Sequence, residues 1–379
     1  MISPRQPKTL KRLVITCGGT GGHFFPGLSI AREFKEEGGE VLLFLSGKNA
    51  DTQADIATLH GIDSVKLTSS PRPNSVTSVF KFTSDTFSGI IAGRRQLKKF
   101  NPDALLAMGS FTSLPSAIGA WSLNIPIFLH DGNARVGKAN RFLSRWAKHL
   151  CTAFPPVNAS QIRCPHSFTG MPVRPELIGS AISKKDAIQS LNIKFGSILD
   201  PELPTMLIFG GSQGAEIFNR NFPEAMLQSI NRQFQVLHLT GHGKFEMVNS
   251  TYEKAFFPFL ALPSASEMDL FYQAADVVVS RSGGSTVAEL TLFGKFAFLV
   301  PYPYAAEDHQ YDNALYMKNG EAAEIIDNAD CTREKVAKLL DRWLENPAKY
   351  RELGAKAKAL SKPHAAADTL QVIRDGLAK

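Results

Sequence analysis

The chain has 379 residues, of which 44% are hydrophobic and 20% are charged, and this balance excludes a disordered chain, a collagen-like repeat and a small disulfide scaffold. The four cysteines lie far apart with no CxxC pair, which indicates buried thiols of a reducing compartment rather than a disulfide framework or a zinc site. The net charge of +7 divides into +11 on residues 1–175 and −4 on residues 176–379, so we expect an anionic partner for the first half, either nucleic acid, phosphates or an acidic membrane surface.

Short apolar runs alternate with helical or loop segments along the first half. The runs cover 13–16, 41–45, 104–108 and 125–129, and the first is followed by a glycine-rich turn and a helix predicted over 28–37. Strands that are buried on both faces read as continuous apolar runs, and crossover helices connect them in parallel sheets. The first half is therefore predicted to be a Rossmann-like, doubly wound parallel sheet.

The second half repeats this scheme. Apolar runs at 206–209, 236–239, 277–279 and 296–300 accompany a glycine-rich turn and a helix predicted over 216–229. Prolines interrupt regular structure within 170–177, where we place the join between the halves. The α/β chain is thus predicted to hold two such domains, 1–175 and 176–345, and a helical tail at 346–379 that packs back toward the first domain.

Glycines follow the first strand at 18, 19, 21 and 22. Glycine in a strand-to-helix turn lets backbone N–H groups approach an anion, which the helix N-terminus also attracts. The spacing is not the G-x-G-x-x-G of dinucleotide enzymes, and no acidic residue ends the next strand. A Gly-Lys-Ser/Thr sequence is also absent, so nicotinamide dehydrogenases and P-loop ATPases fit poorly.

Two comparable turns occur in the second half. The turn at 210–214 adds the Ser212 hydroxyl and the Gln213 amide to free backbone donors, a combination that suits a diphosphate. The segment SRSGGSTVAE at 280–289 follows another apolar run. Glu289, about one turn into the helix predicted there, is a candidate acceptor for the hydroxyls of a ribose.

Six motifs occur in the order seen in the MurG family, and the resemblance extends from about Lys11 to the final helix. They are GGTGGHFFPG, HDGN, GMPVR, FGGSQGAEIFN, SRSGGSTVAE and DHQYDNA. The resemblance implies the GT-B fold, in which two Rossmann-like domains face each other across a cleft. It also implies inverting transfer of GlcNAc from UDP-GlcNAc to the C4 hydroxyl of MurNAc in lipid I, which yields lipid II for peptidoglycan. No metal or other cofactor is implied.

The resemblance also implies substrate-binding residues. Thr20, Gly21 and Gly22 match a turn near the donor and acceptor phosphates, and Asn133 matches a contact to the GlcNAc moiety. Arg174 and Ser212 match residues near the diphosphate, Ala265 matches an apolar residue against uracil, and Gln310 matches a residue at the sugar hydroxyls. The segment around the uridine and ribose corresponds to Gly284, Ser285, Thr286, Val287, Ala288 and Glu289. One extra residue before Asp308 leaves His309 as an alternative to Gln310.

The chain departs from the family pattern mainly in its first half. The usual H-E-Q-N reads HDGN here, GGYVSGP reads GSFTSLP, and Met171 replaces an asparagine. The donor-side motifs match the family better than the acceptor-side motifs do. Two alternatives that also bind a UDP-sugar therefore stay open. One is another UDP-sugar enzyme of this fold, such as a glycolipid glycosyltransferase or a UDP-GlcNAc 2-epimerase, and the other is an inactive nucleotide-sugar-binding protein.

Inverting transfer needs a base for the acceptor hydroxyl, and two residues are candidates. His23 lies at the start of the first predicted helix, and an unperturbed imidazole exchanges protons near neutral pH. Asp131 is the rival, because a carboxylate in a cleft can have a raised pKa. The sequence leaves both candidates open.

Residues 72–99 combine apolar side chains with Lys81, Arg94, Arg95, Lys98 and Lys99, a mixture that suits an anionic membrane. No apolar run approaches the ~18 residues of a spanning helix, and the N-terminus lacks a signal-peptide core. We expect a peripheral protein on the cytoplasmic face of the bacterial cell membrane. Nucleic acid is not expected as a partner, because no aromatic–basic stacking motif occurs.

Overall fold

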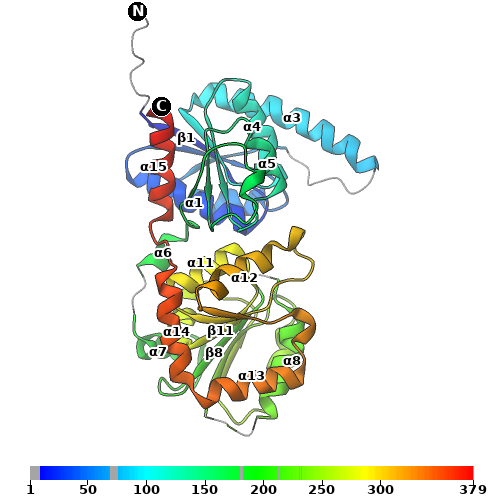
Figure 1. The fold of residues 1–379 in the computed structure, drawn as a ribbon, viewed down its shortest axis with the longest axis vertical. Helices are drawn as coiled ribbons and strands as arrows, with labels where there is room; N and C mark the ends of the chain where they lie inside the picture. The colour runs from blue at the N-terminus through cyan, green and yellow to red at the C-terminus, as the bar shows by residue number, and fades with distance from the viewer. Residues whose placement is uncertain are drawn as a thin grey trace, which may run out of the picture. The chain divides into compact units, whose positions relative to one another are not determined.

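The computed structural model describes residues 9–68, 76–179, 182–211, 213–229, 231 and 233–378, with the side chains of 76–82 left aside. The chain forms two compact units, Met1–Pro175 with Lys362–Lys379, and Glu176–Ser361 (Figure 1). Each unit holds one parallel sheet covered by helices, and the prediction of two doubly wound α/β domains is confirmed. No helix in the described ranges has the length and apolar character needed to cross a membrane.

The first unit has a seven-stranded parallel sheet of order β3-β2-β1-β4-β5-β6-β7. The strand order reverses between β1 and β4, and in such sheets ligands bind beyond the carboxyl ends of the strands at this point. The strands are β1 (Arg12–Thr16), β2 (Glu40–Leu45), β3 (Asp63–Lys66), β4 (Ala104–Ala107), β5 (Ile127–Asp131), β6 (His149–Thr152) and β7 (His166–Phe168).

Helices cover both faces of this sheet because alternate strand residues point to opposite sides. In β1, Leu13 and Ile15 pack in one core with Phe24 of α1, and Val14 packs in the other with Leu97 of α3. The helices are α1 (Gly21–Glu36), α2 (Ala50–Leu59), α3 (Val76–Phe100), α4 (Leu114–Trp121), α5 (Lys138–Leu143) and α15 (Ala365–Ala378), with short 3-10 turns at Phe111–Ser113 and Ala159–Gln161.

Helix α1 begins earlier than the sequence indicates. The sequence predicts the helix from residue 28, yet α1 runs from Gly21 with Pro26 inside it. Proline at this position gives up only the hydrogen bond to the Gly22 carbonyl, close to the helix start. The early start places the helix N-terminus directly at the first glycine turn.

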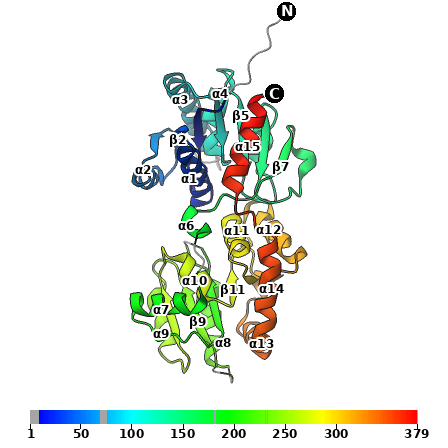
Figure 2. The same cartoon turned by 90° about the vertical axis from the view of Figure 1, so that its left-hand side faces the viewer.

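The last helix of the chain belongs to the first unit. Within the tail predicted at 346–379, α14 (Pro347–Ala359) lies in the second unit, and α15 lies beside the first sheet (Figures 1 and 2). Leu370 and Ile373 of α15 are fully buried in the same core as β1 and α1.

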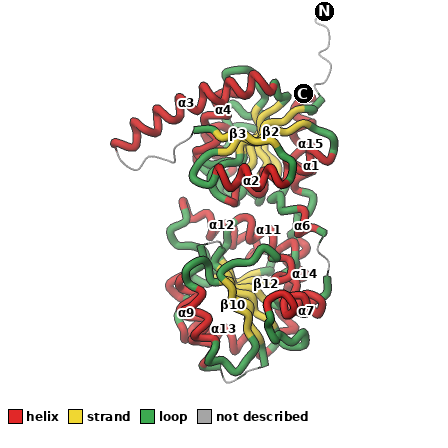
Figure 3. Tube along the Cα trace, turned by 180° about the vertical axis from the view of Figure 1, so that it is seen from behind, coloured by secondary structure: helices red, strands yellow, loops and turns green. Residues whose placement is uncertain are grey.

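The second unit has a six-stranded parallel sheet of order β10-β9-β8-β11-β12-β13 (Figure 3). Its strands are β8 (Thr205–Phe209), β9 (Gln235–Leu239), β10 (Phe259–Leu262), β11 (Val277–Ser280), β12 (Phe296–Leu299) and β13 (Ala323–Ile325). Its helices are α7 (Lys184–Phe195), α8 (Glu216–Leu227), α9 (Phe245–Tyr252), α10 (Met268–Ala274), α11 (Gly284–Leu292), α12 (His309–Asn319), α13 (Arg333–Glu345) and α14, while α6 (Pro175–Ile178) starts at the boundary between the units. Two 3-10 turns, Ala306–Asp308 and Asn328–Asp330, complete it.

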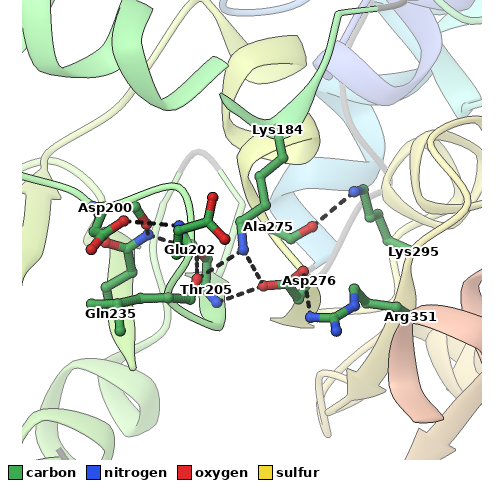
Figure 4. Close-up of polar contacts among 10 residues, drawn as sticks. Lys184, Asp200, Glu202, Thr205, Gln235, Ala275, Asp276, Lys295 and Arg351 are labelled. Carbon is green, nitrogen blue, oxygen red and sulfur yellow. Dashed lines mark hydrogen bonds and ion pairs between the residues drawn. The ribbon is translucent and has the colours of Figure 1, made fainter. Parts of the chain in front are cut away.

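An ion cluster around the buried Asp276 lies at the amino edge of the second sheet, where β8 and β11 begin (Figure 4). Asp276 is 6% exposed, and its Oδ2 accepts from Lys184 Nζ at 2.6 Å and from Thr205 N at 2.8 Å. Arg351 of α14 lies 3.6 Å from the other carboxylate oxygen. Lys295 donates to the Ala275 carbonyl at 2.8 Å, and burial lowers the pKa of this lysine to about 8. The cluster ties two helices to the start of the sheet.

Candidate active site

The first glycine turn connects β1 to α1 and packs against the end of β2. A Cβ on Gly18 would lie 2.3 Å from Ser46 N, and Gly19 has a φ of +102° and donates to the Ser46 carbonyl at 2.8 Å. Glycine is needed at Gly18 for space and at Gly19 for conformation. Thr20, Gly21 and Gly22 are exposed, and the first turn of α1 has no acidic residue. The turn thus presents an open helix N-terminus that favours an anion.

His23 lies at the centre of this end of the sheet. Its Nδ1 hydrogen-bonds with the Thr20 hydroxyl at 3.0 Å, and its side chain is half-buried. A Cβ on Gly109, which follows β4, would lie 3.6 Å from His23 Nε2 and 3.2 Å from Asn140 Nδ2. The structure therefore brings His23 together with the end of β4 and with α5.

The carboxylate of Asp131 is enclosed by donors from the loop and helix that follow it. Gly137 N donates to Oδ2 at 2.8 Å, Asn140 Nδ2 donates to the same oxygen at 3.0 Å, and Asn133 N donates to Oδ1 at 3.2 Å. Asp131 is 5% exposed. Sequence reasoning missed Asn140, which is buried although a polar residue in a short helix usually faces solvent. This set shapes the loop that carries Asn133.

His130, next to Asp131, is a structural residue. It is fully buried, and its Nε2 hydrogen-bonds with the Gly170 carbonyl at 3.1 Å. Burial lowers the pKa of His130 to about 4, so the imidazole is neutral near pH 7. The contact joins the HDGN loop to the start of the GMPVR segment.

The Phe25 ring of α1 lies between Arg174 and the first glycine turn. The guanidinium carbon of Arg174 is 5.7 Å from the centre of the Phe25 ring, and a Cβ on Gly21 would lie 3.4 Å from that ring. Because a guanidinium that stacks on an aromatic face keeps its N–H groups at the edge, Arg174 remains able to bind phosphate oxygens.

The second glycine turn follows β8. A Cβ on Gly210 would lie 2.2 Å from Ala215 N, and one on Gly214, whose φ is +69°, would lie 2.1 Å from the Thr240 carbonyl oxygen. The turn therefore closes tightly on itself and on the loop that follows β9. Ser212, the predicted diphosphate residue, lies outside the described residues.

A buried network holds the loop that packs on Gly214. His238 Nε2 donates to Asn219 Oδ1 at 3.0 Å, and Asn219 Nδ2 donates to the Thr240 carbonyl at 2.9 Å. The Tyr252 hydroxyl lies 3.0 Å from His238 Nδ1 and completes this hydrogen-bond network. Burial alone lowers the pKa of His238 to about 3.

We expect this histidine to make the second unit sensitive to acid. Because the pKa of His238 is lower in the folded state than the ordinary 6.5, the unfolded chain binds the extra proton first, and stability falls as the pH drops below 6.5. The stability advantage of the wild type over His238→Gln should shrink by about 2 kcal/mol between pH 7 and pH 5. Urea unfolding at both pH values measures this, and His242→Gln, at an exposed position, should show no such shift.

The third turn leads from β11 into α11, with Gly283 at the helix start. Ser282 Oγ donates to the Gln310 carbonyl at 2.7 Å, and the Gln310 side-chain oxygen accepts from Tyr302 N at 2.9 Å. His309 Nδ1 lies 2.9 Å from the Ala306 carbonyl. Both candidates for the sugar hydroxyls therefore lie at the start of α12, beside the third turn.

Other predicted donor-side residues belong to the same unit. Ser285, Thr286, Ala288 and Glu289 are half-buried in the first two turns of α11, whereas Gly284 and Val287 are buried. Ala265 is half-buried in the loop between β10 and α10. The Tyr272 hydroxyl donates to Glu289 Oε2 at 2.9 Å.

Comparison with known proteins identifies the family of the chain. Residues 13–152 match the glycosyltransferase family 28 N-terminal domain, and residues 205–370 match the family 28 C-terminal domain. The UDP-N-acetylglucosamine–N-acetylmuramyl-(pentapeptide) pyrophosphoryl-undecaprenol N-acetylglucosamine transferase of Halothermothrix orenii is 31% identical over 96% of this chain and 98% of its own length. The chain belongs to the MurG family. It is a glycosyltransferase by family.

Solved structures agree with this assignment. The MurG structure from Acinetobacter baumannii has a TM-score of 0.76 at 26% identity, covering 96% of this chain and 99% of that one. A UDP-GlcNAc 2-epimerase from Neisseria meningitidis has a TM-score of 0.69 at 12% identity, covering 96% and 99%, and this likeness concerns the fold alone.

Two departures from the MurG pattern pack against each other. A Cβ on Gly132 would lie 2.8 Å from Met171 Cε and 3.8 Å from the Gly22 carbonyl oxygen. Met171 is 4% exposed. Because Gly132 has no side chain, the larger Met171 fits beside the HDGN loop, close to the Gly22 carbonyl of the first glycine turn.

A third departure from the MurG pattern carries backbone strain. Ser110 stands where the family has its second glycine, and its φ of 68° and ψ of 154° lie in a region essentially restricted to glycine. Its hydroxyl accepts only a long 3.4 Å bond from Thr112 N. We expect Ser110→Gly to stabilise the first unit by about 1 kcal/mol, because relief of strain exceeds the added chain entropy.

Calorimetry should therefore record a rise in Tm of about 2–4 °C for Ser110→Gly. Ser113→Gly is the matched control, because Ser113 has an ordinary φ of −83° and its hydroxyl donates to the Ser110 carbonyl at 2.8 Å. This control should lower the Tm. An unchanged or lower Tm for Ser110→Gly would contradict the strain argument.

Proposed function

We propose that the chain transfers GlcNAc from UDP-GlcNAc to the C4 hydroxyl of the MurNAc residue of lipid I, with inversion, and so produces lipid II. The observation that supports this proposal most strongly is the nearly full-length match to a relative named for this transfer. The helix N-termini at the first and third turns, which have no acidic residue in the first turn of α1 or of α11, add support because both substrates contain a diphosphate.

In this proposal His23 is the base that accepts the proton of the attacking hydroxyl. If Nδ1–H donates to the Thr20 hydroxyl, which lies 3.0 Å away, the lone pair of the neutral ring is on Nε2. Nε2 is then the atom that takes the proton, and the hydrogen bond to Thr20 holds the ring in place. Asp131 instead positions the loop that carries Asn133, because its oxygens already accept from three donors.

The departing UDP needs stabilisation of the charge that develops on its diphosphate. We assign this to the N-terminus of α11, to the hydroxyl of Ser212 and to Arg174. Glu289 accepts from the ribose hydroxyls, Ala265 packs against uracil, and Gln310 or His309 binds the sugar hydroxyls.

The deciding experiment is transfer of labelled GlcNAc from UDP-GlcNAc to a lipid I analogue with a shortened prenyl chain, with release of UDP followed in parallel. Stoichiometric product and UDP are expected. UDP-GlcNAc binding without transfer would instead indicate another acceptor, and conversion of UDP-GlcNAc alone to its 2-epimer would indicate an epimerase.

We also propose that the first unit binds the cytoplasmic face of an anionic membrane. Phe87 and Ile91 of α3 are 67% and 55% exposed. An aromatic patch of Trp121, Phe142 and Trp146 adds side chains that are 52%, 41% and 38% exposed. The two tryptophan rings lie 5.5 Å apart, and such rings favour the headgroup region of a bilayer.

Basic residues accompany this aromatic patch. The Arg145 guanidinium lies 5.3 Å from the Phe142 ring, and Arg94 of α3 donates to the Ser122 hydroxyl next to Trp121. Cationic groups beside exposed aromatic rings attract anionic lipid. This patch supports the proposal together with the surface predicted at 72–99, of which residues 72–75 and the side chains of 76–82, Lys81 among them, lie outside the described residues.

Vesicle flotation tests the membrane proposal. Trp121→Ala combined with Trp146→Ala should lower partitioning into vesicles of anionic lipid by about tenfold, because two interfacial anchors are lost. Phe256→Ala is the control, since Phe256 is 77% exposed in the second unit. Equal partitioning of the double variant and the wild type would contradict the proposal.

A further inference from the structure

The side chain of Glu289 is held by a tyrosine from a neighbouring helix. Glu289 is half-buried in the second turn of α11, and its Oε2 accepts the hydrogen bond from the Tyr272 hydroxyl at 2.9 Å. Tyr272 comes from α10, the helix that precedes β11. A buried phenol thus holds a partly exposed carboxylate close to the third turn.

The ring of Tyr272 is itself held on two sides. It is fully buried and stacks on Phe293, with centroids 4.9 Å apart and planes at 20°. Its other neighbour is Phe209, which packs edge-on at 6.0 Å and is the last residue of β8 before the second glycine turn. The hydroxyl therefore has a defined position relative to the second and third glycine turns.

We propose that Tyr272 positions Glu289 to bind the vicinal diol of the nucleotide ribose. A glutamate side chain loses rotamer freedom when it is ordered, and a diol that donates two hydrogen bonds requires one carboxylate orientation. A hydrogen bond to Oε2 orders the carboxylate before the nucleotide arrives. The inference rests on the proposed function, because it requires a uridine diphosphate donor. Tyr272 acts through Glu289 and is a positioning residue.

Tyr272→Phe tests this inference, because it removes the hydroxyl and keeps the packed ring. Calorimetry would compare the affinities of the wild type and the variant for UDP and for 2′,3′-dideoxy-UDP. We expect the UDP affinity to fall about tenfold, as for loss of a hydrogen bond to a charged group, and the dideoxy-UDP affinity to change less than about twofold. In the transfer assay, KM for UDP-GlcNAc should rise about tenfold with kcat within about twofold.

Tyr316→Phe is the matched control, since its hydroxyl donates to the Leu360 carbonyl at 3.0 Å within the same unit. It should leave both affinities unchanged. Equal losses for UDP and dideoxy-UDP in Tyr272→Phe would reveal a purely structural role and overturn the inference, as would an unchanged UDP affinity. A wild-type protein that does not bind UDP would overturn the proposed function and, with it, this inference.

Discussion

Replacing His23 with alanine is expected to lower turnover about 1,000-fold while leaving the affinity for UDP-GlcNAc within about twofold. General base catalysis by a positioned side chain typically contributes 10²–10⁴-fold. His23 lies in the first unit, whereas the residues assigned to uracil and ribose, Ala265 and Glu289, lie in the second. Turnover in the lipid I assay and calorimetric affinity for UDP-GlcNAc measure the two quantities separately.

His60→Ala provides the matched control, because His60 is an exposed histidine at the end of α2 in the same unit. It should retain full turnover. Thr20→Val should have an intermediate effect, since it removes the hydroxyl that hydrogen-bonds with His23 Nδ1. Full activity of His23→Ala would eliminate His23 as the base and return Asp131 to consideration.

Asp276→Ala is expected to lower the free energy of unfolding of the second unit by about 2–3 kcal/mol, because a charged donor and a buried backbone donor lose their acceptor. Lys184 Nζ and Thr205 N would lose the carboxylate oxygen that they share at 2.6 and 2.8 Å. Lys295, which is buried nearby, would lose the attraction that opposes its desolvation. Urea unfolding monitored by circular dichroism measures the loss.

Lys295→Met should recover part of that loss when it is combined with Asp276→Ala, since it removes one of the unpaired charges. The difference in free energy of unfolding between the wild type and Lys295→Met should also depend on pH. Because the folded-state pKa of Lys295, about 8, is below the ordinary 10.5, the charged lysine costs stability at pH 7, and this cost is relieved as the pH rises. Between pH 7 and 9 the wild type should gain about 1 kcal/mol relative to Lys295→Met. Parallel pH profiles would contradict this account.

The sequence predicts the two sheets because their central strands are continuous apolar runs. Strands β3, β6, β7, β10 and β13 are missed. Each has only three or four residues, and β3, β7 and β13 also contain polar, partly exposed residues. The glycine turns are also readable, since glycine is needed where backbone conformation or space demands it. Contacts between elements distant in the sequence are not readable. Asn140 under Asp131 and Tyr272 on Glu289 reach their partners only once the sheets have formed.

The placement of α15 has a consequence for synthesis on the ribosome. All seven strands of the first unit precede residue 175, yet the helix that completes one of its cores is translated only after the whole second unit. A Cβ on Gly376 would lie 2.5 Å from Phe128 of β5, so α15 lies directly on the sheet. At 5–20 residues per second the nascent first unit waits about 10–40 s with this apolar face uncovered. Chains that end before α15 keep this apolar face exposed, which makes them prone to aggregate.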